Sequence, residues 1–279
     1  MNRQHSSRTG RHLLRWMVIL MAGWVATGSA QEDVVGTFKH VKPQIIDVGS
    51  YTVHVLEVSD PASKFDGIAV VWTLMSKDGI GISIENIGKQ GVANDIYREN
   101  SSSDDLVVLS AGFHDANNQS IGLFLSQGKE MSSVEPWTTG GVLYQGPHTF
   151  GIIPIKQWSR GPDVLYAVQA KPMVVEDGHN GILSDDGILF DRVGIGFTRS
   201  GELLVCGAFR KKNYRAFSEY DFGRLMATTV EDGGPGARTV LGLEGGPGAH
   251  IYFPELQRHF GQSGSDFVMN AIHVRRRAR

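Results

Sequence analysis

Short apolar runs separated by glycine, aspartate, asparagine and proline are the feature that most restricts the fold of this chain. The sequence holds 35 glycines, and its apolar runs are about four to eight residues long, which is the length of strands. Residues 51–58 alternate between apolar and polar side chains, whereas residues 106–109 are continuously apolar, as in a strand buried on both faces. With further strands expected at 67–72 and 164–168, the pattern predicts a layered sheet.

Two helices are expected among these strands. Apolar side chains recur at three- and four-residue spacing over residues 219–231, Ser218 and Asp221 can form a capping box, and two glycines follow at 233 and 234. A weaker helix is expected within residues 84–98. Because the strands do not alternate regularly with helices, the sequence predicts an α+β fold with strand-rich mixed sheet layers and a few packed helices.

The first thirty residues have the features of a secretory signal peptide. An apolar run at 16–25 is followed by small residues at 28–30, and we predict cleavage after Ala30. The arginines that precede the apolar run, without any acidic residue, are Arg3, Arg8, Arg11 and Arg15. The run is shorter than the roughly 20 residues of a spanning helix. We therefore expect one domain over residues 31–279, secreted or periplasmic, with no stable membrane span after cleavage.

Charge and cysteine content exclude other classes of protein. The 27 basic side chains, less the four arginines of the leader, leave 23 against 29 acidic ones, a net charge of −6. This balance argues against a nucleic-acid partner, which requires a basic surface. The basic cluster at residues 275–279 is expected to be a frayed, solvated tail. Cys206 is the single cysteine, so an intramolecular disulfide is impossible.

Five segments that contain glycine-bounded turns or charged strand ends follow one another along the chain. They are residues 109–115 with 121–129, 167–178, 192–204, 241–252 and the closing 268–274. In this order they resemble the phosphodiester glycosidase family, through its Asn-Gly-Gly-Phe-Phe-Asp turn and hairpin, its Gln-x-x-Pro strand, its arginine-led hairpin, its Asn-Leu-Asp-Gly-Gly signature and its final strand. The resemblance covers most of the chain that follows the leader.

The chain departs from the family pattern at several positions of these motifs. The departures are Ser110 and Ala111 for Asn-Gly, His114 for the second Phe, Gly242 for Asn, Glu244 for Asp, and Gly248 for a small hydroxyl residue. Membership of a fold family tolerates such changes more easily than catalytic activity does.

The resemblance implies three catalytic residues. Arg192 is the candidate phosphate clamp, because a guanidinium binds phosphate in a bidentate manner and keeps its charge. Glu244 and Asp115 are the candidate carboxylates, one as nucleophile or base and the other as electrostatic support. Structural alternatives remain open: Arg192 in an ion pair with a neighbour such as Asp191, and the two carboxylates as acceptors of turn hydrogen bonds.

Five further residues are candidates for substrate binding. Gln169 would donate to sugar hydroxyls, with a buried strand hydrogen bond as its structural alternative. His114 would carry a proton or act as a ligand near the site, with a structural or surface role as its alternative. Gly112, Gly245 and Gly246 would allow tight turns or a close approach of substrate. No Cys/His cluster has metal-ligand spacing, so neither a metal nor another cofactor is expected.

We therefore expect an exported hydrolase that cleaves a sugar from a glycan or glycolipid phosphodiester. Two alternatives stay open at this point. One is a catalytically degenerate protein that binds glycans or a partner in the cell envelope. The other is an ordinary glycoside hydrolase that uses Asp115 and Glu244 as paired carboxylates. The sequence leaves the sugar, the aglycone, the stereochemical outcome and the oligomeric state open.

Overall fold

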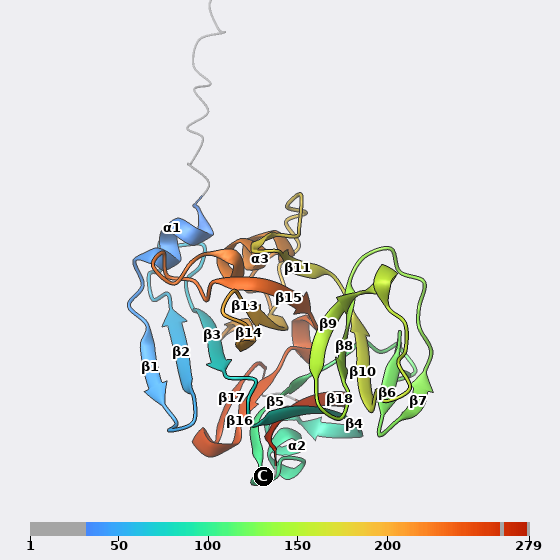
Figure 1. Ribbon diagram of the computed structural model, residues 1–279. Coiled ribbons are helices and arrows are strands. Elements are labelled where there is room, and N and C mark those ends of the chain that lie inside the picture. Colours follow the sequence, from blue (N-terminus) through green and yellow to red (C-terminus); the bar gives the residue numbers. More distant parts are fainter. Residues whose placement is uncertain (1–31, 263–264, 278–279) are drawn as a thin grey trace, which may run out of the picture. The chain divides into compact units, whose positions relative to one another are not determined.

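Three antiparallel sheets and three short helices make up the part of the chain that the computed structural model describes, residues 32–262 and 265–277 (Figure 1). The arrangement confirms the α+β class predicted from the sequence. Residues Asp33–Arg279 group into one unit. The predicted leader and its cleavage site lie outside the described residues.

The largest sheet has eight strands in the order β1-β2-β3-β14-β13-β15-β11-β12. Their bounds are β1 Gln44–Asp47, β2 Thr52–Glu57, β3 Ile68–Met75, β14 Leu203–Arg210, β13 Arg192–Thr198, β15 Ala237–Gly242, β11 Met173–Glu176 and β12 His179–Asn180. β13 and β14 form the hairpin expected over residues 192–204, and β2 and β3 form the strands expected at 51–58 and 67–72. β13 therefore lies near the middle of the sheet, between β14 and β15.

Two five-stranded sheets complete the strand content of the described residues. One is ordered β7 (Lys129–Ser132), β6 (Phe124–Ser126), β10 (Tyr166–Ala170), β8 (Gly141–Gln145) and β9 (Phe150–Pro154). The other is ordered β17 (Arg258–Phe260), β16 (Ile251–Phe253), β5 (Asp105–Ser110), β18 (Ser265–Arg276) and β4 (Ile80–Val92). Every residue of β5 is buried, as its continuous apolar run predicts.

One hydrophobic core joins the three sheets, because it contains buried side chains of each, such as Val71, Val168 and Ile272. A second core fills the space between the largest sheet and the helices α1 (Val34–Lys39) and α3 (Glu219–Ala227). The third helix, α2 (Ala93–Glu99), packs against β4 and β18. Single 3₁₀ turns occur at Ile155–Gln157, Gly246–Gly248 and Pro254–Leu256. In the described segments, no helix has the length and apolar character required to cross a bilayer.

The helices differ in extent from those expected from the sequence. α3 begins as predicted, with the Ser218 hydroxyl accepting a hydrogen bond from the amide of Asp221 at 3.2 Å. It ends at Ala227 rather than near residue 231, because Thr228 adopts an extended conformation and Val230 points into solvent. The weaker helix is α2, which begins at Ala93 and lies within the expected range 84–98 except for its last residue, whereas residues 84–92 belong to β4.

The described part of the basic C-terminal cluster, residues 275–277, is not the solvated tail that was expected. Arg275 and Arg276 are the last residues of β18. Arg275 Nε lies 2.6 Å from Asp105 Oδ1 and its Nη1 lies 2.8 Å from Glu85 Oε1, while Arg276 pairs with Glu255. The prediction was wrong because Asp105 is buried on β5, and a buried carboxylate is stable only beside an opposite charge.

Asp105 connects two strands of the same sheet through buried charge. Burial by itself raises the pKa of its carboxyl, but hydrogen bonds from His273, Arg275 and the amide of Ser102 outweigh this effect and lower the pKa to about 2. The carboxylate is therefore bound more strongly in the folded chain than in the unfolded chain. It stabilises the fold above its unfolded pKa of 3.8, and this contribution is lost as the pH falls toward 2.

We expect the variant Asp105→Asn to lower the free energy of unfolding by about 3 kcal/mol at neutral pH, because it leaves His273 and Arg275 without their carboxylate. The wild type should lose about 2 kcal/mol between pH 4 and pH 2 through this group. Urea denaturation across this pH range measures both effects. The control is Asp104→Asn, the exposed neighbour, and equal stability of the two variants would contradict the role assigned to Asp105.

Candidate functional site

A cavity of about 310 Å³ lies where the ends of strands from all three sheets approach one another. Arg192 is the first residue of β13 and Glu244 follows β15, and the two strands pair antiparallel with Gly194 opposite Gly242. Phe113 follows β5 of one five-stranded sheet, and Lys171 follows β10 of the other. Segments far apart in the sequence therefore supply one lining.

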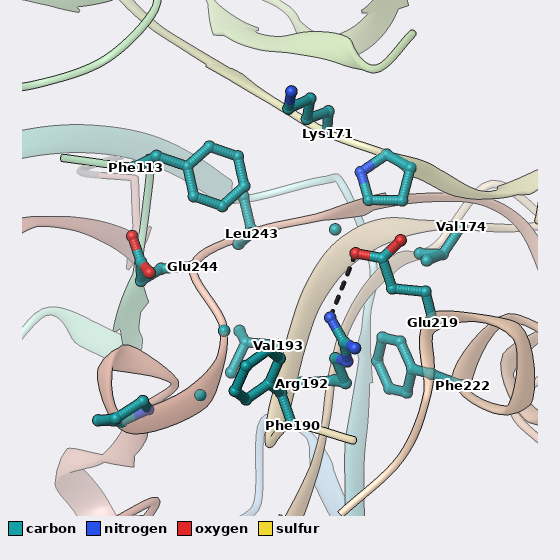
Figure 2. Close-up of a pocket in the computed structure, with 15 residues that line it drawn as sticks. Phe113, Lys171, Val174, Phe190, Arg192, Val193, Glu219, Phe222, Leu243 and Glu244 are labelled. Atoms are coloured by element: carbon teal, nitrogen blue, oxygen red, sulfur yellow. Dashed lines mark hydrogen bonds and ion pairs between the residues drawn. The ribbon is translucent and has the colours of Figure 1, made fainter. Parts of the chain in front are cut away.

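The cavity has a charged and an apolar part. Its charged lining residues are Lys171, Arg192, Glu219 and Glu244, and its apolar ones are Phe113, Pro172, Val174, Phe190, Val193, Phe222, Leu243 and Pro247, together with glycines 242, 245 and 246. In Figure 2, the Arg192–Glu219 pair and Glu244 lie on opposite sides of the view, with Phe190 and Leu243 between them. Such a lining suits a ligand with both an anionic group and a ring.

Arg192 is largely buried and is held by three hydrogen bonds. Its Nε donates to the carbonyl of Phe217 at 3.1 Å, its Nη2 donates to the carbonyl of Ile188 at 3.0 Å, and its Nη1 lies 3.2 Å from Glu219 Oε1. Burial lowers the pKa of the guanidinium and the Glu219 carboxylate opposes this effect. Three of the five N–H groups of a guanidinium are engaged, so each terminal nitrogen keeps one donor for a ligand.

The ion-pair partner of Arg192 is Glu219 rather than the neighbouring Asp191 that the sequence suggested. Asp191 is buried, and its Oδ1 accepts a hydrogen bond from the amide of Arg210 at 3.0 Å. Burial raises the pKa of its carboxyl to about 7, against the lowering effect of that hydrogen bond. Its backbone carbonyl accepts from the amide of Gly246 at 2.9 Å and so connects β13 to the glycine-rich turn.

Glu244 is held between two segments at the edge of the cavity. Its amide donates to the carbonyl of Ala111 at 3.1 Å, and its Oε2 lies 3.6 Å from Nδ1 of His114. The side chain crosses directly over Gly248, where an added Cβ would approach Glu244 Cγ to 2.7 Å. Carbon atoms do not approach so closely without displacement. The glycine at 248 therefore makes room for the glutamate at 244.

Gly245 and Gly246 shape the turn that follows β15. Gly246 has φ +62°, a conformation that residues other than glycine rarely adopt, and a Cβ there would lie 3.2 Å from the ring of Phe190. A Cβ on Gly245 would lie 3.3 Å from the carbonyl of Asp191. Both glycines also line the cavity, and a close approach of substrate to them stays a prediction.

His114 and Gly112 lie on the other side of Glu244. Together with Glu244 and His250 they line a second, narrow cavity of about 10 Å³, which has room for about one water molecule. A Cβ on Gly112 would approach Val168 Cγ2 to 2.7 Å. Gly112 is thus required for the packing of β5 against β10, and it lies beside the site rather than in the larger cavity.

Asp115 is not brought into either cavity lining. Its Oδ1 accepts hydrogen bonds from the amides of Asn117 and Gln119 at 2.8 and 2.9 Å. The hydrogen bond from the amide of Gln119 has the largest effect on the pKa of the Asp115 carboxyl and lowers it. Burial opposes this effect, and the amide of Asn117 lowers the pKa further. The carboxylate therefore closes its own turn, which was the structural alternative, and its catalytic role remains a prediction without support from this geometry.

Gln169 is a buried connector and does not line the larger cavity. Its Oε1 accepts from the amides of Leu123 and Glu135 at 3.0 and 2.9 Å, and its Nε2 donates to the carbonyl of Glu135 at 2.8 Å. These three bonds fix the segment from β6 to residue 137 against β10. The structural alternative to a sugar ligand describes what the side chain does here.

Two charged residues of the lining were missed by the sequence analysis, Lys171 and Glu219. Lys171 lies in the Gln-x-x-Pro segment, and its ammonium also lies 4.7 Å from the centre of the Trp137 ring. Glu219 is the first residue of α3, a position that favours acidic side chains in any helix, so nothing in its local sequence indicated a site. Residues 32–262 and 265–277 contain no group of three potential metal ligands.

Comparison with known proteins identifies one matching family model. A family model described as phosphodiester glycosidase matches residues 104–275. A search of curated protein sequences gives no match. The structure is similar to the catalytic domain of zebrafish N-acetylglucosamine-1-phosphodiester alpha-N-acetylglucosaminidase auto-inhibited by its pro-peptide, at 10% identity and a TM-score of 0.60, covering 85% of this chain and 88% of that one.

A second similar structure is a hypothetical protein from Synechocystis. It has 13% identity and a TM-score of 0.55, over 85% of this chain and 64% of that chain. At these identities the two structures establish a shared fold, whereas the family model rests on the sequence itself.

We expect Gln169→Ala to lower the free energy of unfolding by about 3 kcal/mol, because two amides and one carbonyl lose their buried partner. Hydrogen exchange should increase at Leu123 and Glu135 before it increases elsewhere. Thermal denaturation and exchange mass spectrometry measure these changes. The control is Gln157→Ala at an exposed site. A variant as stable as the control, with weaker sugar binding, would restore the ligand role.

Proposed function

The chain belongs to the phosphodiester glycosidase family, and from this we propose that it is a hydrolase that releases a sugar from a glycan or glycolipid phosphodiester. The observation that carries the proposal is that Arg192 and Glu244 line the same cavity. The reaction requires these two kinds of group, a cation for the phosphate and a carboxylate beside the anomeric carbon.

Arg192 binds the phosphodiester in this proposal. The remaining N–H of each terminal nitrogen can engage two phosphate oxygens, and Lys171 adds a second positive charge to the same lining. Glu219 keeps the guanidinium oriented and balances its charge while the cavity holds no anion. Because a phosphate is a good leaving group, the reaction depends little on protonation by a general acid.

Glu244 acts at the sugar in this proposal. As positive charge develops at the anomeric carbon, its carboxylate stabilises that charge and either attacks the carbon or activates water. The contact with His114 at 3.6 Å and the close passage over Gly248 limit where the carboxylate can lie. Phe113 and Phe190 offer apolar ring faces to the sugar within the same cavity.

An ordinary glycoside hydrolase with Asp115 as the second carboxylate has less support. The other carboxylate in the lining is Glu219, which is paired with Arg192. We also propose that the protein acts outside the cytoplasm, as the features of residues 1–30 suggest.

We expect Glu244→Gln to lower kcat on a soluble sugar-1-phosphodiester by on the order of 10³-fold, since it removes the charge with little change of shape. Arg192→Lys should raise KM about tenfold, because an ammonium cannot engage two oxygens in a fixed fork. Steady-state release of sugar and phosphomonoester measures both.

The matched controls are Glu176→Gln, at the exposed end of β11, and Arg199→Lys, just beyond the far end of β13. Wild-type rates in both active-site variants would contradict the residue roles. A wild-type protein that binds the phosphodiester without turnover would favour the catalytically degenerate alternative.

Gly248 provides a second test of the same site. We expect Gly248→Ala to push the Glu244 carboxylate by about 1 Å and to lower kcat by about 10²-fold, since misplacement of this size is enough to disturb catalysis. Gly161→Ala is the control, because a Cβ there meets its nearest neighbour, Val164 Cγ2, at an ordinary 3.8 Å. Unchanged kcat in Gly248→Ala would show that the position of Glu244 is not critical.

A further inference from the structure

Two surface loops beside the cavity are paired with each other. They are residues 181–190, between β12 and β13, and residues 211–217, between β14 and α3, and we call them the paired loops. The amides of Phe190 and Phe217 each donate to the carbonyl of the other at 3.0 Å, and the rings of Phe190 and Tyr214 stack with their centres 6.3 Å apart. Phe190 also lines the cavity.

The paired loops expose large apolar side chains. Leu183 is 95% exposed, Ile188 52%, and Leu189 and Tyr214 are each 39% exposed. Other exposed apolar residues, such as Ile45 on β1 and Met131 on β7, lie on separate elements. Exposed aliphatic and aromatic side chains gathered at one place mark an interaction surface more often than scattered ones do.

Basic residues accompany these apolar ones on the paired loops. Lys211, Lys212 and Arg215 are all exposed, and Lys211 also pairs with Glu57. Asp185 and Asp186, which accept amides of their own turns at 3.0 and 2.9 Å, keep their negative charge, so the three basic residues exceed the two aspartates by one charge. Aliphatic and aromatic side chains beside lysine and arginine suit the interface of an anionic bilayer.

The cavity and the paired loops share structural elements. The carbonyls of Ile188 and Phe217 hold the guanidinium of Arg192, and Phe190 lies between the exposed loop residues and the cavity. A phosphate bound at Arg192 therefore lies beside the paired loops.

We propose that the paired loops seat the protein on an anionic lipid surface, and that the substrate is a glycolipid phosphodiester whose lipid chain lies against Leu183, Ile188 and Tyr214. The substrate part of this inference rests on the proposed function, because it assumes that a phosphodiester binds at Arg192. The inference that the paired loops bind an anionic lipid surface does not depend on the proposed function. It is supported by the exposed apolar side chains and the charge of these loops.

Vesicle sedimentation tests the surface. Residues 31–279 are used, since Asp33–Arg279 form one unit and the apolar leader would bind lipid by itself. Sucrose-loaded vesicles of phosphatidylglycerol mixed with phosphatidylcholine should bind the wild type, and vesicles of phosphatidylcholine alone should bind it more weakly. We expect Leu183→Ser/Leu189→Ser to weaken binding about tenfold, and Lys212→Glu/Arg215→Glu to remove the preference for phosphatidylglycerol.

Matched controls separate this surface from general adhesion. Ile45→Ser/Val230→Ser removes exposed apolar side chains elsewhere, and Lys89→Glu/Lys129→Glu reverses exposed charges on β4 and β7. Both should bind like the wild type. Absence of wild-type binding to either vesicle, or equal losses in the loop and control variants, would overturn the proposed surface.

Activity assays distinguish this inference from the proposed function. Leu183→Ser/Leu189→Ser should keep its rate on a soluble sugar-1-phosphodiester and lose about tenfold on a glycolipid phosphodiester embedded in vesicles. Equal rates of wild type and variant on the embedded substrate would overturn the substrate class. A wild type inactive on the soluble substrate would overturn the proposed function. The vesicle-binding result would still decide whether the paired loops bind an anionic lipid surface.

Discussion

The antiparallel pairing of β13 with β15 is the interaction on which the site depends. It places the first residue of one strand, Arg192, beside the turn that follows the other, which carries Glu244. The pairing extends past β15, because the amide of Leu243 donates to the carbonyl of Val193 at 2.9 Å, and the next amide, that of Glu244, donates to Ala111 beyond β5. One run of backbone hydrogen bonds thus connects two sheets, and it positions a cation and a carboxylate without any flexible loop between them.

Buried charge is compensated in the same manner at two places in the molecule. Asp105 is surrounded by His273 and Arg275 in the sheet that contains β5, and Arg192 is held by Glu219 and two carbonyls at the cavity. The difference is accessibility. Asp105 has no exposed side-chain surface and stabilises the fold, whereas Arg192 faces a cavity of about 310 Å³ and keeps donors for a ligand. The same chemistry therefore serves stability in one place and binding in the other.

Three of the departures from the family pattern, at positions 114, 244 and 248, lie close together in the structure. Glutamate in place of aspartate at 244 needs space for one more methylene, and Gly248, in place of a small hydroxyl residue, provides that space because it has no Cβ to meet Glu244 Cγ. His114, in place of a phenylalanine, lies 3.6 Å from the same carboxylate. Two changed positions, 114 and 248, thus lie beside the third, Glu244. The changed residues therefore fit one another sterically. The paired loops beside Arg192 place the site next to an exposed apolar surface.

The sequence by itself determined the strand-rich α+β class, the buried strand β5 and the cap of α3, because each follows from a local pattern of apolar and capping residues. The β13–β14 hairpin was implied by the family resemblance. The family resemblance indicated that Arg192 and Glu244 belong together. Tertiary structure decided the rest. Asp115 and Gln169 form hydrogen bonds with nearby backbone groups, and Glu219 and Lys171 reach the cavity from distant elements. Arg275 belongs to a strand in which it pairs with the buried Asp105. A local sequence pattern predicts which secondary structure a segment can form. It does not predict the partner of a buried polar group, because that partner lies on a strand that comes close only when the chain folds.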